Sequence, residues 1–531
     1  MIDQLNWSAT IVFVVFFAVV TILGFVASRW KAGDLAQLQE WGLGGRRVGT
    51  GSTWFLLGGD LYTAYTVIAV PALVYAVGAY GFFAVPYTII AYPLVFVTMP
   101  RLWSVAHRRG FLTAGDFVSG RYGNKWLELA VAFTGILATM PYIALQLIGM
   151  EKVIQALGFQ GGGTLGSHLP LTIAFIILAL YTYRSGLRAP AMIAFVKDFM
   201  IYAFVIAAII IIPVKLGGYG AIFEAAQQAY DAAQKASDAK GSGATFGLLL
   251  KPAQFAAFIT VAIGSAMALF MYPHSMTGVL SASSSNAIKR NSILLPAYSL
   301  VLGLIALMGF MGHAAGIKVS NPQDVVPQLF LKMFSDANWF VGFVFAAIAI
   351  GALVPAAVMS IGAANTFTRN IWRPFVQPNL TGAAEAFLAK LASLVVKVGA
   401  LLVILFIPAK FAIDFQLLGG VWMIQVFPAV VFGLYTRWFN GWALLAGWAV
   451  GMALGTWLSL GAQGVTVTHS VFDLFIAYNG FVSVLANLAV SAVLTLLVPN
   501  TSPDTTGRED YESGASVHAA PVRGVAVAAR G

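Results

Sequence analysis

The amino-acid sequence predicts an all-α membrane protein with about thirteen transmembrane helices, and its composition carries this prediction. Of 531 residues, 59% are hydrophobic and only 9% are charged, whereas soluble domains carry about 25% charged residues. Apolar runs of about 20 residues, long enough to cross the hydrocarbon of a bilayer, recur along the chain. The predicted spans cover residues 8–28, 51–78, 82–100, 127–156, 170–184, 190–214, 253–282, 292–313, 335–366, 387–408, 413–435, 441–462 and 472–498.

The basic residues are distributed unevenly between the predicted loops. If the N-terminus lies outside, every arginine falls in a cytoplasmic loop or in the C-terminal tail. This is the positive-inside pattern of a bacterial inner-membrane protein. We therefore interpret the net charge of +10 as a topology signal and expect no nucleic-acid partner. The chain has no cysteine, which excludes disulfides and thiol catalysis, and no Walker A sequence, so no nucleotide is expected.

Residues 1–498 are expected to form one transmembrane domain. No Lys or Arg precedes Ile11, so the basic region of a cleaved signal peptide is missing and the first span is expected to be retained. An odd number of spans places the tail, residues 499–531, in the cytoplasm. That tail lacks an apolar pattern, which predicts disorder.

Two predicted spans contain residues that interrupt helices. The second has a Gly-Gly-Asp triplet at residues 58–60 and then Pro71, and the seventh has Gly264 and a Pro-His pair at residues 273–274. Glycine and proline free backbone polar groups that hydrocarbon cannot satisfy, so such breaks belong where the backbone lines a cavity or is buried in protein.

The two interrupted spans lie five spans apart. This spacing predicts two five-helix repeats of opposite topology, at about residues 51–214 and 253–435. Broken helices at matching places in two halves are typical of a transporter binding site. The alternative is that Gly and Pro are simply frequent in membrane helices; two breaks at this spacing favour the binding site.

Five segments follow one another in an order found in a known family. They are LGGRRVG at 43–49, LTAGDFVSGRYG at 112–123, YTYRSGLRA at 181–189, YPH at 272–274 and PAVVFGLYTRWFNGWALLAG at 428–447. Together they resemble the sodium:solute symporters, and the resemblance covers most of residues 40–450. It implies a LeuT-type 5+5 inverted-repeat core with one extra N-terminal and two C-terminal helices. It also implies a transporter and not an enzyme.

Three further segments resemble one branch of that family. They are WGLGGRR at 41–47, WFLLGGDLYTAYTVIAVPALVYAVGA at 54–79 and GILATMPYIALQLIG at 135–149. The branch is that of the bacterial monocarboxylate uptake permeases, which carry lactate, pyruvate, propionate and in some cases alanine. The resemblance implies a small anionic substrate.

The resemblance also implies a sodium site between the first and eighth core helices. The residues that would contribute to it are Gly59, Tyr62 and Gly351. On the eighth core helix, residues 345–372, Val354 and Pro355 stand where the family has two hydroxyl residues, and Ser360 is the nearby hydroxyl. Sodium prefers several oxygen ligands, so this sequence departs from the family pattern at that site.

Lys197 lies within the sixth predicted span, seven residues after Pro190. A charged side chain at that depth is costly and predicts a functional site. In the family alignment its helix borders the departing sodium position, where a fixed ammonium could take the place of the ion and exchange a proton. The alternatives are that Lys197 extends to the cytoplasmic surface or pairs with Asp198 or Asp60.

Asp60 is the matching carboxylate in the second span. Its role could be cation ligand, proton carrier or counter-charge to Lys197, and the structural alternative is a cap at the helix break. Two other intramembrane lysines, Lys390 and Lys397, are expected to extend toward the cytoplasmic surface.

A carboxylate substrate needs hydrogen-bond donors or positive charge. Helix N-termini at the two breaks supply both, and polar or aromatic side chains near them are candidates to line the pocket. These candidates are Thr63, Tyr65, Tyr142, Gln146, Tyr272, His274, Trp422 and Gln425.

We therefore predict a secondary transporter that imports a short monocarboxylate by cation-coupled symport, with a proton as the favoured ion and no cofactor. The alternative is a sodium-coupled carrier of a small amino acid such as alanine or proline. A sensor is disfavoured because only 32 residues follow Pro499. The lipid bilayer is the expected surrounding, and the need for an accessory subunit stays open.

Overall fold

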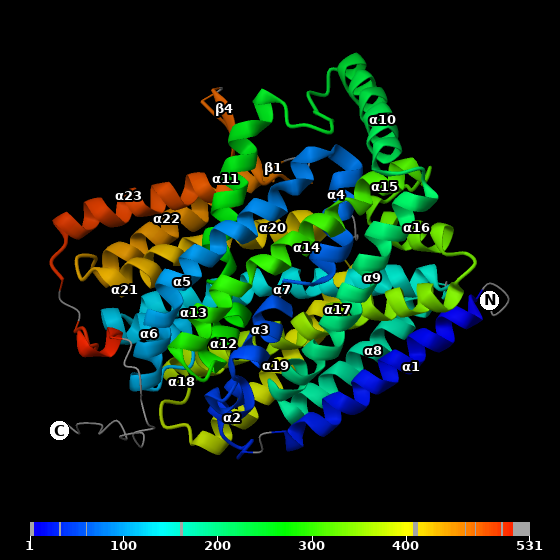
Figure 1. The fold of residues 1–531 in the computed structure, drawn as a ribbon. Helices are drawn as coiled ribbons and strands as arrows, with labels where there is room; N and C mark the ends of the chain where they lie inside the picture. The colour runs from blue at the N-terminus through cyan, green and yellow to red at the C-terminus, as the bar shows by residue number, and fades with distance from the viewer. Residues whose placement is uncertain are drawn as a thin grey trace.

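The computed structural model describes residues 5–30, 33–59, 61–159, 163–406, 412–461, 464–472, 474–500 and 503–512. These residues are mostly helical, and the helices pack side by side as one bundle (Figure 1). Side chains of residues 163–168, 403–406 and 412–415 lie outside the description.

The first half of the chain contains both long and short helices. The helices are α1 (Trp7–Val26), α2 (Leu38–Leu43), α3 (Thr50–Gly59), α4 (Val70–Val77), α5 (Ala84–Arg109), α6 (Ala114–Tyr122), α7 (Lys125–Ala156), α8 (Gly163–Ser185), α9 (Arg188–Lys215) and α10 (Tyr219–Lys240).

The second half adds further helices and two short antiparallel strand pairs. The helices are α11 (Pro252–Leu269), α12 (Pro273–Ser281), α13 (Ser285–Leu294), α14 (Pro296–Ala306), α15 (Met308–Ala314), α16 (Val325–Met333), α17 (Asn338–Phe367), α18 (Arg373–Phe375), α19 (Gly382–Phe406), α20 (Ala412–Met423), α21 (Gly433–Tyr435), α22 (Gly441–Ser459) and α23 (Asn479–Leu497). The strand pairs are β1 (Leu460–Gly461) with β2 (Gly464–Val465), and β3 (Thr468–Val471) with β4 (Phe475–Tyr478).

Ten helical stretches among the described residues are long and apolar enough to cross a membrane. Several predicted boundaries are wrong: α8 starts at Gly163 and not at residue 170, and the helical stretch predicted from residue 292 starts at Ser285. The third span continues as α5 to Arg109, because its basic end keeps helical backbone hydrogen bonds. The last span was expected from residue 472, but α23 starts at Asn479 because β3 and β4 pair in the preceding stretch.

The core of the bundle is built around α17, whose residues from Val344 to Thr366 are all buried. Helices α1, α7, α9, α12 and α19 all contact it. On the outside, apolar side chains stay exposed, for example Ile11 on α1 and Leu496 on α23. A large apolar surface of this kind is suited to contact with lipid.

The arginine-rich loops meet one another at one end of the bundle. Arg188 at the start of α9 pairs with Glu40 on α2, and Arg369 after α17 lies 3.2 Å from Asp116 on α6. Loops that are predicted to lie on the same side of the membrane therefore meet at the same end of the helix bundle, as the positive-inside pattern requires.

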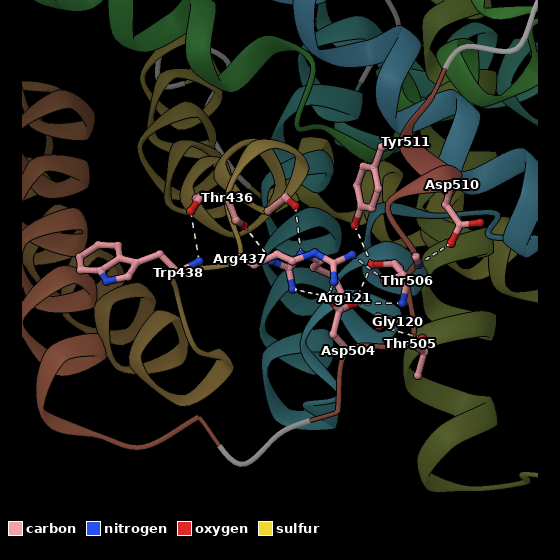
Figure 2. Close-up of polar contacts among 12 residues, drawn as sticks. Gly120, Arg121, Thr436, Arg437, Trp438, Asp504, Thr505, Thr506, Asp510 and Tyr511 are labelled. Atoms are coloured by element: carbon pink, nitrogen blue, oxygen red, sulfur yellow. Dashed lines mark hydrogen bonds and ion pairs between the residues drawn. The ribbon is translucent and has the colours of Figure 1, made fainter.

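Residues 503–512 pack against this same end, although the tail was expected to be disordered. Thr505 donates from its backbone N–H, at 2.9 Å, to the carbonyl of Gly120, and Arg109 lies 2.5 Å from Asp510. The ring of Tyr511 is buried, and its hydroxyl lies 2.8 Å from that of Thr506 (Figure 2). The expectation of disorder is therefore wrong for this segment, because its acidic and aromatic side chains contact arginines near the ends of the helices.

Candidate functional site

The first predicted break is present. Helix α3 ends at Gly59, and a π-helical turn at Tyr65–Ala69 leads into α4. Between them the backbone makes a few local bonds, such as Leu61 N–H to the Gly58 carbonyl at 2.9 Å. Asp60 lies outside the described residues, so its role stays a prediction.

The second break separates α11 from α12 at residues 270–272. Pro273 starts α12, where its missing N–H costs no helical bond. Gly264 lies inside α11 and not at the break: a Cβ there would be 2.6 Å from the Tyr478 ring, so this glycine serves close packing. The half-helices α3 and α12 are joined through Val48, which exchanges backbone hydrogen bonds with Ser281 and Ser283.

Lys197 on α9 reaches the first break and is completely buried. Its Nζ donates to the carbonyl of Gly59 and, at 3.2 Å, to that of Tyr62. The same Nζ lies 3.1 Å from Oδ1 of Asp198. The alternative that Lys197 extends to the surface is therefore wrong, and pairing with Asp198 is what the structure shows.

Asp198 is held from its other side by a tyrosine. The Tyr298 hydroxyl donates to Oδ2 of Asp198 at 2.6 Å, and the Tyr62 hydroxyl donates to the Tyr298 carbonyl at 3.3 Å. A Cβ at Gly58 would lie 2.2 Å from the Tyr298 ring, so only glycine allows α3 to approach this closely. The buried ion pair is thus tied to the backbone of the break.

Among the described residues, the oxygen atoms at this point do not form a sodium site. The two carbonyls that would bind the ion, those of Gly59 and Tyr62, accept hydrogen bonds from an ammonium. The facing helix α17 presents Gly351, where a Cβ would be 3.9 Å from the Tyr62 carbonyl oxygen. The hydroxyl of Ser360 is bonded elsewhere, to the Ala357 carbonyl at 2.8 Å.

Two of the predicted substrate residues cap the helix that restarts after the first break. The side-chain oxygen of Gln146 on α7 accepts from Ala64 N–H at 2.8 Å. The hydroxyl of Thr63 accepts from Tyr65 N–H at 3.0 Å. Both side chains are buried and supply the acceptors that a broken helix lacks.

Aromatic side chains gather at the second break. The ring centroids of Tyr142 and Tyr272 are 5.7 Å apart, and the His274 ring lies 5.5 Å from Tyr142 and 5.2 Å from Tyr272. The buried hydroxyl of Tyr272 has no hydrogen-bond partner among the described residues. Tyr65 is buried too, at the start of the helix after the first break. The Tyr272 hydroxyl at the second break is therefore a buried polar group whose hydrogen-bonding capacity the described residues do not use.

A pocket of about 10 Å³ borders the second break. It is lined by residues of α6, α7 and α17 together with Met271 and Pro273. This volume holds about one water and is too small for a carboxylic acid.

Trp422 and Gln425 point away from both breaks. Trp422 donates to the Thr456 hydroxyl on α22 at 2.9 Å. Gln425 is fully buried, donates to Ser483 on α23 at 2.8 Å and accepts from Asn487 at 3.2 Å. These two side chains join α20 and the following turn to the last two helices.

Two residues near Lys197 are missing from the sequence-based site. The sequence marks Asp198 only as an alternative partner of Lys197 and does not mark Tyr298, because no local pattern relates residues that lie 100 positions apart. Lys397 was expected to extend to the surface, but it is 2% exposed and donates to the Ser393 hydroxyl at 2.6 Å. Lys390 stays partly exposed above the Tyr183 ring.

Two solved structures share this architecture. One is the substrate-bound, outward-open state of a Na⁺-coupled sialic acid symporter, with a TM-score of 0.73 and 16% identity over 92% of this chain and 98% of that one. The other is Mhp1, a nucleobase-cation-symport-1 family transporter in a closed conformation, with a TM-score of 0.53 and 13% identity over 91% and 100%. At these identities the likeness shows the fold, which is of the LeuT type as predicted.

Similar sequences point the same way. A monocarboxylate transport permease protein of Rhizobium johnstonii is 58% identical over 507 residues, which cover 95% of this chain and 99% of that protein. The uncharacterized symporter YodF of Bacillus subtilis is 32% identical over 93% of this chain and 94% of its own length. The sequence pattern of the sodium:solute symporter family matches residues 41–451. The chain therefore belongs to the sodium:solute symporter family and is a multi-pass membrane transporter of a small solute, not an enzyme.

Proposed function

We propose that this transporter imports a short monocarboxylate together with a proton, and that Lys197 carries the proton. The substrate class is supported by the 58% identical relative that is named a monocarboxylate permease. The coupling ion is supported by one observation above all: the ammonium of Lys197 hydrogen-bonds the carbonyls of Gly59 and Tyr62. These are the two carbonyls that the family resemblance assigned to sodium.

A proton on Lys197 has a direct mechanical consequence for the first break. Backbone carbonyls at membrane depth need donors, because no water replaces them. The charged amine supplies donors to two carbonyls and balances Asp198 at 3.1 Å. Loss of the proton removes one donor and leaves Asp198 without a full counter-charge. The end of α3 is then free to rearrange, which links the proton to the half-helix that alternating access must move.

The substrate carboxylate is proposed to bind at the second break. The buried Tyr272 hydroxyl has no hydrogen-bond partner among the described residues, and the rings of Tyr142 and His274 form aromatic walls beside it. An unpaired buried hydroxyl is costly, so a ligand that accepts its hydrogen bond is favoured there. Gln146 and Thr63 are proposed to act indirectly, by holding the first break in shape.

The test is transport in proteoliposomes that separates coupling from binding. Accumulation of labelled lactate or pyruvate is driven by an inward proton gradient in sodium-free buffer, with the membrane potential clamped by potassium and valinomycin. Exchange of internal for external substrate is measured at equal pH on both sides, where no net proton flow is needed. We expect wild type to do both and Lys197→Met to retain exchange while losing accumulation.

A sodium-coupled carrier of a small amino acid, such as alanine or proline, is the second candidate. It is favoured by the name of the family and by the Na⁺-coupled sialic acid symporter that shares the fold. Accumulation of alanine or proline that depends on a sodium gradient, with no response to a proton gradient, would establish this candidate and refute the first.

The membrane orientation is part of the proposal. The N-terminus is proposed to lie outside a bacterial inner membrane and the C-terminus in the cytoplasm, as the arginines predict. The chain contains no cysteine, so a single introduced cysteine is the only thiol that a maleimide can label. Ser242→Cys is expected to react with an impermeant maleimide from outside whole cells, and Thr381→Cys only after the membrane is opened. The reverse pattern would invert the topology.

A further inference from the structure

A polar pocket of about 510 Å³ lies between the end of α5, the turn around α21 and the tail segment 503–512. This volume falls within the roughly 300–1,000 Å³ of small-molecule sites. Its charged lining consists of one acidic and four basic side chains. They are Glu512, Arg101, Arg121, Arg437 and Arg508.

Two of the arginines build the wall of the pocket. Arg121 donates to the Gly433 carbonyl at 3.1 Å and to the Thr436 carbonyl at 2.7 Å, and its Nη1 lies 2.9 Å from Asp504. Arg437 shares Asp504, at 3.3 Å. Figure 2 shows both guanidinium groups side by side, with Asp504 beneath them. Their donors are therefore largely used within the protein.

The other two arginines keep donors available. Arg101 donates from Nε to the Leu434 carbonyl at 2.6 Å. Its guanidinium carbon lies 5.0 Å from the centre of the Tyr435 ring and 5.1 Å from that of Tyr511. Among the described residues, its two terminal nitrogens have no hydrogen-bond acceptor. Within that same part of the chain, the side chain of Arg508 has neither a hydrogen bond nor an ion pair.

The pocket lies at the level of a membrane interface. Next to it, Tyr435, Trp438 and Trp442 are about half exposed on the outside of the bundle, and exposed Tyr and Trp are enriched where the bilayer meets water. The pocket lies at the end of the bundle that the distribution of arginines predicts to be cytoplasmic. Basic pockets between helices at this level are suited to anionic headgroups.

We propose that this pocket binds a phosphate group, held by Arg101 and Arg508, and that the group is supplied by an anionic phospholipid headgroup or by a soluble phosphate ester. The planar guanidinium of Arg101 is fixed between two rings, so it presents its terminal N–H groups as a preformed fork to phosphate oxygens. Arg508 adds a second donor from the tail. A bound phosphate would join the tail to α5.

The experiment compares the purified full chain with two variants by native mass spectrometry. Arg508 is exposed and on the tail, so Arg508→Gln removes one donor without disturbing the bundle. The matched control is Arg29→Gln, an exposed arginine at the end of α1 and outside the pocket. Phosphatidylglycerol is the lipid probe and phosphatidylcholine its zwitterionic comparison. Glycerol 3-phosphate, added to protein in phosphatidylcholine, is the soluble probe and is read by the shift in thermal unfolding.

We expect wild type and Arg29→Gln to retain phosphatidylglycerol in preference to phosphatidylcholine, and Arg508→Gln to bind it about fivefold more weakly, as one arginine near an anionic surface implies. Arg508-dependent binding of phosphatidylglycerol alone supports the proposal and makes the source a lipid. Arg508-dependent stabilisation by glycerol 3-phosphate supports it with a soluble source. Equal binding of every probe by Arg508→Gln, Arg29→Gln and wild type would overturn the proposal.

Discussion

Replacing Lys197 with methionine removes the ammonium and keeps most of the side-chain volume. The change leaves Asp198 buried without its cation and two carbonyls, those of Gly59 and Tyr62, without their donor. Breaking a fully buried pair from one side costs about 3–5 kcal/mol. This is a large share of the roughly 5–15 kcal/mol that stabilises a typical domain. We therefore expect a clear drop in the midpoint of thermal unfolding.

The pH dependence of that loss identifies its cause. With no cation beside it, the buried Asp198 is expected to take up a proton, because an isolated buried charge neutralises. The unfolded chain leaves this carboxyl ionised at neutral pH, so the folded variant binds one proton more than the unfolded one. Stability of Lys197→Met must then fall as pH rises, by about 1.4 kcal/mol per pH unit at most. Wild type, whose pair carries no net charge, is the comparison.

The double variant Lys197→Met with Asp198→Asn tests the pair directly. Removing both charges is expected to recover most of the lost stability and to abolish the added pH slope, because a neutral amide needs no counter-ion. Unfolding is followed by intrinsic fluorescence in detergent at several pH values. A single variant as stable as wild type at every pH, or a double variant no better than the single, would refute the role given to the pair.

Three other substitutions test separate parts of the site. Gly58→Ala places a Cβ 2.2 Å from the Tyr298 ring; overpacking of this kind costs about 1–3 kcal/mol, and we expect lower stability and less transport. Gln146→Leu leaves Ala64 N–H without its acceptor, at a cost of about 1–3 kcal/mol, and we expect weaker substrate exchange. Lys397→Met removes a buried ammonium that has no carboxylate partner among the described residues; we expect equal or higher thermal stability.

Each of these changes has a matched control. Gly51 lies on the same helix as Gly58 and has open space where its Cβ would be, so Gly51→Ala is expected to be neutral. Equal effects of alanine at both positions would contradict the packing argument. Gln155→Leu removes a less buried amide from α7, and exchange as weak as in the Gln146 variant would argue against a specific cap. Lys390→Met removes a partly exposed lysine and is the control for Lys397→Met. If Lys397→Met is destabilised and Lys390→Met is not, the Lys397 amine stabilises the fold.

The sequence alone determined the class of protein and the places where its helices break. Hydrophobic composition and run length decide membrane insertion without reference to packing. The triplet at residues 58–60 and Pro273 mark the breaks because Gly and Pro act on the local backbone. The unusual intramembrane Lys197 was visible for the same reason: its cost in hydrocarbon depends on the residue and its depth in the membrane.

Tertiary structure alone decided which neighbour each helix face meets. Trp422 and Gln425 share a face by their spacing, as predicted, but that face turns to α22 and α23, away from the breaks. Tyr298 meets Asp198 only because α14 packs against α9. Asp504 in the tail segment pairs with Arg121, from which it is separated by 383 positions of sequence. Helical periodicity sets which side chains point the same way, whereas their partners depend on the packing of distant segments, which no local pattern encodes.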